Sequence, residues 1–153
     1  MNKVTVKIKK LENYDENLPL PSYETIGSAG ADIRASLMPE KTICLEPGQR
    51  KLIPTGLSME IPQGFEIQVR PRSGMSFKTS LMVLNAPGTV DSDYRGEVKI
   101  IMGNLGSEVQ EILHGDRVAQ IVLAPVTQAE FEITETLTPT ERGAGGFGST
   151  GKS

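Results

Sequence analysis

The sequence predicts an all-β protein, a jelly-roll-like barrel or sandwich with one short helix and a flexible, Gly-rich C-terminal tail. The first reason is that apolar and polar residues alternate in many short runs, which is the pattern of half-buried strands. The second is that the 153 residues include 16 glycines and 10 prolines, enough to supply turns at short intervals. Many short strands joined by frequent turns are typical of sandwiches, jelly rolls and barrels.

Strand candidates follow one another along most of the chain. The first is formed by Val4, Val6 and Ile8, which alternate with Thr and Lys. Turn signals such as Pro54-Thr55-Gly56 separate the others. These are Ala31–Ala35, Thr42–Leu45, Arg50–Ile53, Leu57–Ile61, Phe65–Arg70, Met82–Asn85, Val98–Asn104, Val109–Leu113, Arg117–Pro125 and Glu130–Thr134. Only Ser73–Leu81 is expected to be helical, as one short piece.

We expect one domain, with a β core over residues 1–134 and a linker and mobile lid over residues 135–153. The last part is polar, and after Arg142 it carries a single large apolar side chain, Phe147. Such a composition buries too little surface to order itself. Between Thr134 and Arg142 an extended chain reaches roughly 25 Å, at about 3.3 Å per residue, so the lid can extend to a neighbouring subunit.

Composition narrows the class of function. A net charge of −3 and a pI near 5.3 argue against a nucleic-acid-binding protein, which would show a basic face. The chain has no run of about 18 apolar residues and no signal-peptide core, so no membrane association is expected. Cys44 is the only cysteine and lies in an apolar stretch, which predicts a buried thiol and a reducing, cytoplasmic location. His114 is the only histidine, so a histidine-based metal cluster gains no support.

The segment Asn85–Glu97 is the most informative stretch of the sequence. It carries two acids, Asp91 and Asp93, together with Tyr94 and an arginine, on a backbone shaped by one proline and two glycines. Proline fixes φ and glycine permits positive φ, so we expect a tight β-hairpin with exposed main-chain polar groups. Such groups can bind the edge of a flat ligand, and an acid beside them can activate water. The alternative is an acidic surface turn.

Three further segments combine polar side chains with turns. Ala29–Ala35 places Asp32 at a strand start after a turn of small residues. Pro71–Lys78 places an arginine, a serine and a glycine at the entry to the expected helix, which suits an anion, although an N-capping serine with a solvated arginine explains it equally. Gly115–Gln120 leads from a turn into an apolar strand, and by itself it is an ordinary strand start.

The tail contains a sequence that resembles a phosphate-binding loop. Residues Gly146–Ser153 match the pattern G-x-x-x-x-G-K-[ST], but a P-loop requires a buried strand before it and a helix after it, and the sequence ends at Ser153. We therefore reject the nucleotide-fold interpretation. Flexible glycine amides, hydroxyls and Arg142 still suit phosphate groups, and Phe147 can stack on a base. The alternative is a disordered tail.

Five segments of the chain occur in the order and spacing of the five motifs of the trimeric dUTPases (dUTP pyrophosphatases), and the chain resembles this family over nearly its whole length. They are Ala29–Ala35, Pro71–Lys78, Asn85–Glu97, Gly115–Gln120 and Arg142–Gly151. The resemblance implies a homotrimer of jelly-roll-like subunits with shared active sites. It also implies hydrolysis of dUTP to dUMP and pyrophosphate, with Mg²⁺ assisting the attack of water on the α-phosphate. This reaction limits uracil incorporation into DNA and supplies dUMP for thymidylate synthesis.

The resemblance also implies roles for individual residues. Asp91 matches the acid that activates water, Tyr94 the ring that packs under the sugar and excludes a 2′-hydroxyl, and Asp32 the acid that holds Mg²⁺ through water. The remaining substrate contacts fall into groups for uracil, phosphates and lid. They are Asn85, Gly88, Thr89, Val90 and Lys99 for the uracil pocket, Arg72, Ser73, Gly74 and Gln120 for the phosphates, and Arg142, Phe147, Gly148, Ser149 and Thr150 for the lid.

Two other functions remain as alternatives at this point. A dCTP deaminase shares the fold implied by the resemblance, but the Tyr94-Arg95-Gly96 sequence and the Gly-rich tail favour the hydrolase. A regulatory module would keep the fold and the nucleotide site without turnover. The chain departs from the usual helix motif Gly-Leu-Ala at Gly74-Met75-Ser76, beyond the residues expected to hold phosphate, so the departure affects local packing alone.

Overall fold

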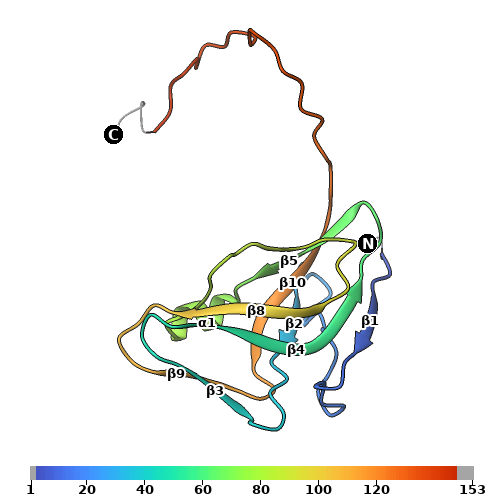
Figure 1. The fold of residues 1–153 in the computed structure, drawn as a ribbon, viewed down its shortest axis with the longest axis vertical. Helices are drawn as coiled ribbons and strands as arrows, with labels where there is room; N and C mark the ends of the chain where they lie inside the picture. The colour runs from blue at the N-terminus through green and yellow to red at the C-terminus, as the bar shows by residue number, and fades with distance from the viewer. Residues whose placement is uncertain (1–2, 148–153) are drawn as a thin grey trace.

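Two four-stranded antiparallel sheets form the body of the protein in the computed structural model, which describes residues 3–147 (Figure 1). The first sheet has the order β1 (Lys7–Lys10), β4 (Arg50–Glu60), β8 (Glu97–Asn104), β6 (Leu81–Val83). The second has the order β2 (Ala31–Arg34), β10 (Arg117–Pro125), β5 (Phe65–Arg70), β7 (Gly88–Val90). A two-stranded ribbon pairs β3 (Thr42–Leu45) with β9 (Gln110–Leu113). The prediction of an all-β, jelly-roll-like fold is confirmed.

The strands form where apolar residues recur at every second position. In β8, Val98, Ile100 and Met102 are buried while Lys99 between them is exposed. The same period places Ala31 and Ile33 of β2 inside. Side chains from both large sheets belong to one continuous buried cluster, which is almost wholly aliphatic, so the core lies between the sheets. With burial worth about 25 cal/mol per Å² of apolar surface, this cluster is the main source of stability.

Residues 54–56 do not form the predicted turn between two strands. β4 runs without interruption from Arg50 to Glu60, and its pairing with β8 shifts register between Pro54 and Ser58. Gly56 has a φ of +68°, and a β-carbon there would lie 2.7 Å from the Cα of Tyr14. Proline and glycine therefore produce a bulge inside one long strand, because the bulge absorbs the irregular backbone and lets the N-terminal loop approach.

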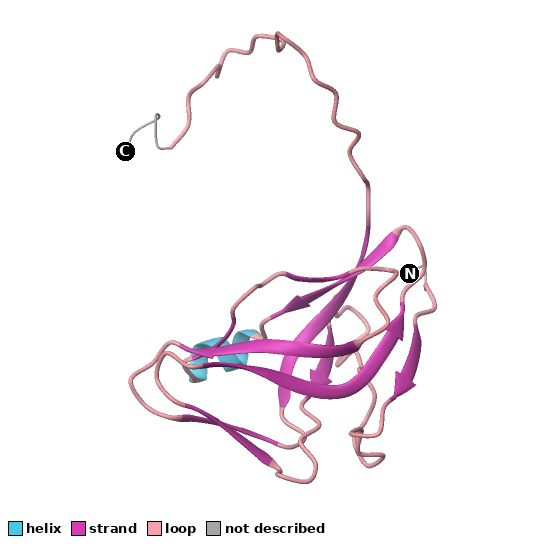
Figure 2. Cartoon of the chain, viewed as in Figure 1, coloured by secondary structure: helices cyan, strands magenta, loops and turns pink. Residues whose placement is uncertain are grey.

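The helix is shorter than predicted, and the last predicted strand is absent. α1 spans Ser73–Lys78 and ends before β6 begins, because Leu81 pairs with Asn104 of β8. Residues 126–147 contain no helix or strand and leave the sheets after β10 (Figures 1 and 2). The prediction of a strand at Glu130–Thr134 is therefore wrong within this single chain. Its apolar residues are fully exposed, with Phe131 at 94% and Ile133 at 101% of their accessible surface, so no neighbouring strand covers them.

Two other expectations need correction. The arms of Asn85–Glu97 do not pair with each other as a hairpin, because β7 pairs with β5 in one sheet while β8 pairs with β4 and β6 in the other. The segment instead crosses between the sheets. Cys44 is exposed rather than buried, since β3 belongs to the small ribbon and turns this side chain outward toward Glu111. Among residues 3–147, no helix has the length and apolar character needed to span a membrane.

Candidate active site

One hollow of about 290 Å³ lies beside the start of α1, and we call it the arginine pocket. Its walls come from the loop before β2, from β2, from the first residues of α1 and from β10. The lining residues are Glu24, Ser28, Ala29, Gly30, Asp32, Arg72, Ser73, Gly74 and Gln120. The predicted phosphate contacts and the predicted metal-holding acid thus lie together, although they come from segments up to 88 positions apart in the sequence.

Asp32 binds two arginines at this pocket. Its Oδ1 accepts a hydrogen bond from Arg72 Nε at 2.8 Å, and its Oδ2 accepts one from Arg117 Nη1 at 3.1 Å. Arg117 also approaches Glu24 at 3.4 Å. Because these two arginines face two carboxylates, their formal charges cancel. The Asp32 side chain is only 12% exposed, so the ion pairs are shielded from solvent and hold the Arg72 guanidinium in a fixed direction.

Gln120 fits against a glycine on the other side of the same pocket. Its amide Nε2 donates to the carbonyl of Pro71 at 2.9 Å. A β-carbon at Gly30 would lie 2.2 Å from Gln120 Oε1, so only glycine leaves room for this amide. The N-cap of α1 is Arg72 and makes no side-chain capping bond, so the alternative of an N-capping Ser73 is wrong. Ser73 is instead exposed in the wall of the pocket.

A second hollow of about 470 Å³ lies where Asn85–Glu97 meets β4 and β8, and we call it the tyrosine pocket. Its lining residues are Leu52, Asn85, Thr89, Val90, Asp91, Tyr94, Glu97, Val98, Lys99 and Ile101. All the predicted residues of the uracil and sugar pocket except Gly88 are among them. Gly88 is buried in β7, where a β-carbon would lie 3.0 Å from the Asn85 amide nitrogen. The two pockets have no lining residue in common.

Backbone contacts hold Asp91 and Tyr94 together. The Tyr94 N–H donates to the Asp91 carbonyl at 3.2 Å, which closes a four-residue turn. The Tyr94 hydroxyl donates to the Glu97 carbonyl at 2.9 Å, so the ring folds back over Gly96. The Asp91 carboxylate is exposed at the rim of the pocket. An ionised carboxylate in this position can orient a water molecule for attack on a bound ligand.

Glu97 is a pocket residue that sequence reasoning did not identify. Its Oε1 accepts hydrogen bonds from Asn13 Nδ2 and from the Gly56 N–H, both at 2.8 Å, and its Oε2 lies 3.6 Å from Lys99 Nζ. Glu97 therefore ties the end of Asn85–Glu97 to the N-terminal loop and to the bulge of β4. The available signal was its spacing from Lys99, because residues two apart in a strand point to the same face.

The predicted lid residues lie outside both pockets. Arg142 Nε donates to the Gly145 carbonyl at 2.8 Å within the tail itself, and the Phe147 ring is fully exposed. Gly148, Ser149 and Thr150 fall outside the described residues. In Figure 1 the chain after β10 runs away from the sheets, so in this chain the described part of the tail covers neither pocket.

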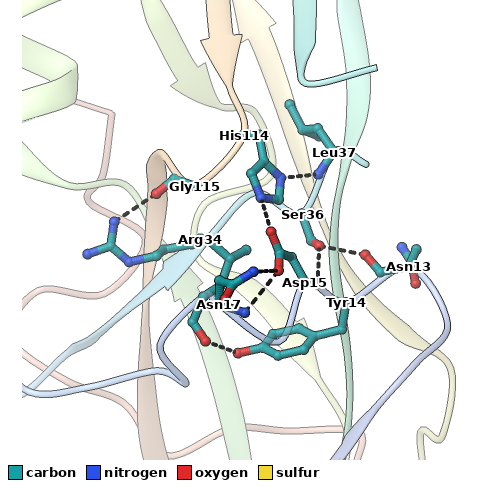
Figure 3. A network of polar contacts seen from close by, with 10 residues as sticks. Asn13, Tyr14, Asp15, Asn17, Arg34, Ser36, Leu37, His114 and Gly115 are labelled. Carbon is teal, nitrogen blue, oxygen red and sulfur yellow. Dashed lines mark hydrogen bonds and ion pairs between the residues drawn. The ribbon is translucent and has the colours of Figure 1, made fainter. Parts of the chain in front are cut away.

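A polar network surrounds His114 (Figure 3). The Leu37 N–H donates to His114 Nδ1 at 2.9 Å, and His114 Nε2 contacts Asp15 Oδ2 at 3.0 Å. The first contact requires an unprotonated Nδ1, so Nε2 carries the proton and donates to Asp15. Next to the histidine, the Gly115 carbonyl accepts a hydrogen bond from Arg34 Nη1 at 2.7 Å. The network thus joins the N-terminal loop, the end of β2 and the start of β10.

Asp15 accepts several hydrogen bonds at the centre of this network. The Asn17 backbone N–H, followed by the His114 ring, lowers the pKa of the Asp15 carboxyl below its usual value. Both contacts stabilise the charged form, because each donates a proton toward the carboxylate. The network therefore contains an ionised acid that links the loop before β2 to the turn before β10.

The two pockets differ in chemistry. The arginine pocket suits an anionic group, and the tyrosine pocket suits a planar group, so together they suit a ligand that has both. Nucleotides combine both parts, so the fold and the pockets define a candidate nucleotide-binding protein. The family model for dUTPase matches residues 16–151. The chain belongs to the dUTPase family.

Relatives of known name agree with this assignment over the full length of the chain. A deoxyuridine 5′-triphosphate nucleotidohydrolase of Bdellovibrio bacteriovorus is 59% identical over 99% of both chains, and one of Roseobacter denitrificans is 55% identical over 97% of both. The dUTPase of Staphylococcus bacteriophage 80alpha with dUPNHPP superposes with a TM-score of 0.85 at 27% identity, covering 98% of this chain and 100% of that one. A mutant dUTPase from phage phi11 of S. aureus, reported to coordinate a structural Mg(II) ion, has a TM-score of 0.77 at 25% identity and covers 89% of this chain and 100% of that one.

Proposed function

We propose that each active site combines an arginine pocket with a tyrosine pocket. At this site the protein hydrolyses dUTP to dUMP and pyrophosphate. The dUTP diphosphatase activity follows from membership of the family over nearly the full length of the chain. The observation that carries the assignment of residues is the sorting of the predicted contacts. Those for phosphate line one pocket, and nearly all those for uracil and sugar line the other.

In the arginine pocket, the proposed ligand is the triphosphate. Arg72 donates to phosphate oxygens from the direction that Asp32 fixes, while Ser73, Gly74 and Gln120 supply further donors. Charge on the three phosphates must be neutralised, and the nearby arginines are already balanced by Asp32 and Glu24. A divalent cation fits this requirement, since Mg²⁺ commonly uses one carboxylate, waters and substrate phosphates as ligands. We therefore assign Mg²⁺ to Asp32, through water, where it would neutralise phosphate charge.

In the tyrosine pocket, the proposed ligand is the deoxyuridine. Asn85 and the backbone of residues 88–91 hydrogen-bond the uracil edge, and Lys99 borders the same space. Main-chain donors and acceptors matched to uracil would remain unpaired against cytosine, which rejects dCTP. Thymine differs by one methyl group, worth about 1–3 kcal/mol, so the pocket must reject it by shape. Asp91 orients the attacking water, and the Tyr94 ring lies against the sugar.

The assembly we propose is a homotrimer whose sites combine residues of different chains. The outer face of the first sheet carries exposed apolar side chains, Leu52, Met82 and Leu84, beside Ile101, a surface suited to a subunit interface. Phe131 and Ile133 alternate with polar residues and are fully exposed, as expected of a strand that pairs with another chain. The lid residues, from Arg142 to Thr150, then close over a neighbour's site. The lone cysteine supports a reducing, cytoplasmic location.

Release of pyrophosphate from dUTP in the presence of Mg²⁺ tests the reaction. Turnover by the wild-type protein supports the hydrolase, whereas ammonia release from dCTP would instead indicate a deaminase. Tight dUTP binding without turnover would indicate a regulatory module. Either of the latter two results, without pyrophosphate release, contradicts the proposal.

Light scattering and subunit mixing test the shared site. The intact protein should have the mass of a trimer, and a monomer mass would rule out shared sites. An Asp91→Asn variant and a variant truncated after Glu141 should each be nearly inactive. When the two are unfolded and refolded together, mixed trimers contain sites with an intact Asp91 from one chain and an intact lid from another. We expect activity to reappear on mixing, and no recovery in mixed trimers contradicts the model.

A further inference from the structure

Gly96 lies directly under the Tyr94 side chain at the edge of the tyrosine pocket. The Tyr94 hydroxyl reaches across it to the Glu97 carbonyl at 2.9 Å. A β-carbon at Gly96 would lie 2.3 Å from the Tyr94 hydroxyl oxygen, 2.6 Å from Cζ and 3.0 Å from Cε2. Non-bonded carbon atoms are best placed about 3.5–4.0 Å apart, so this ring position and any side chain at residue 96 exclude each other.

The backbone gives no other reason for a glycine here. Gly48, Gly56, Gly64 and Gly115 all have φ between +68° and +86°, where other residues are strained. Gly96 is outside this left-handed region, so alanine can adopt its backbone conformation. The glycine is therefore needed because it leaves space, and the Tyr94 side chain occupies that space.

We infer that Gly96 is a positioning residue for Tyr94, and through it a determinant of selection between deoxyribonucleotides and ribonucleotides. The inference rests on the proposed function, in which the Tyr94 ring excludes a 2′-hydroxyl. The ring reaches its place against the sugar because no β-carbon stands beneath it. Alanine at residue 96 pushes the ring away from the Glu97 carbonyl and opens the space that a 2′-hydroxyl requires.

The displacement is expected to leave the fold intact. The atoms that an alanine β-carbon would meet belong to the far end of one side chain, and Tyr94 is 45% exposed. The ring can therefore swing toward solvent without moving the backbone or the core. Selectivity between nucleotides changes, whereas the temperature of unfolding changes little.

The test compares the wild type with Gly96→Ala, Tyr94→Ala and the double variant. For each protein, kcat/KM is measured by pyrophosphate release from dUTP and from UTP, and the ratio of the two values is the readout. We expect Gly96→Ala to lower this ratio by at least about tenfold, toward that of Tyr94→Ala, because excluding one small group is typically worth a factor of 10 or more. In the Tyr94→Ala background, Gly96→Ala should have no further effect, since the two act as one unit.

Two other glycines serve as matched controls. Gly27→Ala introduces a β-carbon with no atom within 4 Å, so both rates and their ratio should stay at wild-type values. Gly30→Ala displaces Gln120 in the arginine pocket. It should slow dUTP and UTP alike and leave the ratio unchanged, because both nucleotides carry the same triphosphate.

The outcomes separate this inference from the proposed function. Wild-type protein that releases no pyrophosphate from dUTP contradicts the proposed function. Wild-type turnover with an unchanged ratio in Gly96→Ala, or a further loss of ratio in the double variant, overturns the role of Gly96 alone. If Gly96→Ala fails to fold because its β-carbon clashes with the Tyr94 ring, the double variant, which lacks this ring, should fold as well as Tyr94→Ala. A double variant that also fails to fold overturns the inference.

Discussion

The arginine pocket and the tyrosine pocket are held together by different kinds of contact. In the arginine pocket the charged contacts join side chain to side chain, and Asp32 links Arg72 to Arg117 through both of its oxygens, while Gln120 donates to the Pro71 carbonyl. In the tyrosine pocket the backbone takes part in most contacts. The Asp91 carbonyl accepts from the Tyr94 N–H, and the Glu97 carbonyl accepts from the Tyr94 hydroxyl. The first pocket therefore depends on charge, and the second depends on the course of the chain.

This difference predicts different responses to substitution. Removing a charge from the arginine pocket should disturb the binding of any triphosphate, whatever its base or sugar. Changing shape in the tyrosine pocket should instead alter which nucleoside is accepted. The Asp91 carboxylate is the exception. It lines the tyrosine pocket, but the role we propose for it is in the reaction itself.

The largest effect is expected from Asp91→Asn. The amide keeps the size of the side chain but removes the charge that orients water, so kcat for dUTP should fall by roughly 10²- to 10⁴-fold. The carboxylate is exposed, so the free energy of unfolding should remain close to that of the wild type. Pyrophosphate release and urea denaturation measure the two quantities. Wild-type turnover by Asp91→Asn would remove the acid from the mechanism.

Arg72→Ala and Arg117→Ala form a matched pair in the arginine pocket. Both break an ion pair with Asp32, but Arg72 alone lines the hollow. We expect Arg72→Ala to lower kcat/KM for dUTP and for UTP by about 10²-fold each, as is typical for loss of one donor to a charged group. Arg117→Ala should have a smaller effect. Equal losses in both variants would show that Asp32, rather than the Arg72 guanidinium, is what the pocket requires.

His114→Ala should change stability without changing nucleotide selectivity. It removes the acceptor for the Leu37 N–H and the donor to Asp15 (Figure 3), and the histidine lines neither pocket. Leaving a buried donor unpaired costs about 1–3 kcal/mol, which urea denaturation can measure. The dUTP-to-UTP ratio of kcat/KM should stay at the wild-type value. An altered ratio with unaltered stability would give the histidine a role in nucleotide selection rather than in stability.

The smallest effect concerns the pH dependence of stability. Because the folded protein lowers the pKa of Asp15, its carboxylate stabilises the fold above about pH 4, and this contribution is lost as the pH falls through the lowered pKa. Asp15→Asn should therefore be less stable than the wild type at pH 6, and the difference should shrink on acidification toward pH 3. Unfolding curves at several pH values test this. A difference that grows on acidification contradicts the direction of the pKa shift.

Local patterns predicted most strands, because alternation is a property of neighbouring residues. Thr42–Leu45, Phe65–Arg70 and Arg117–Pro125 have the predicted bounds. The errors arose where contacts between residues far apart in the sequence determine the local structure. The bulge at Gly56 depends on Tyr14, 42 positions earlier, and nothing near residue 130 reveals that no strand within residues 3–147 covers it.

The candidate site was predicted in part for the same reason. The five segments contained most of the polar pocket residues, since turns with polar side chains are visible locally, but not Glu24, Ser28 or Lys99. The resemblance grouped these residues by phosphate and uracil. Local patterns did not reveal that the two groups line separate hollows, because the segment Asn85–Glu97 crosses between the sheets. Glu97 was missed because its partners, Asn13 and Gly56, are far away in the sequence. The role of Gly96 was missed for a similar reason, because the sequence does not show that the Tyr94 ring lies over this glycine.

The rate of pyrophosphate release across a nucleotide panel tests the central claim most directly. Wild-type protein with Mg²⁺ is compared on dUTP, dTTP, dCTP and UTP at equal concentrations. If the tyrosine pocket selects the nucleoside and the arginine pocket binds the common triphosphate, dUTP should be hydrolysed at least about tenfold faster than each of the others. Similar rates on all four nucleotides, or no pyrophosphate from dUTP, would contradict the account.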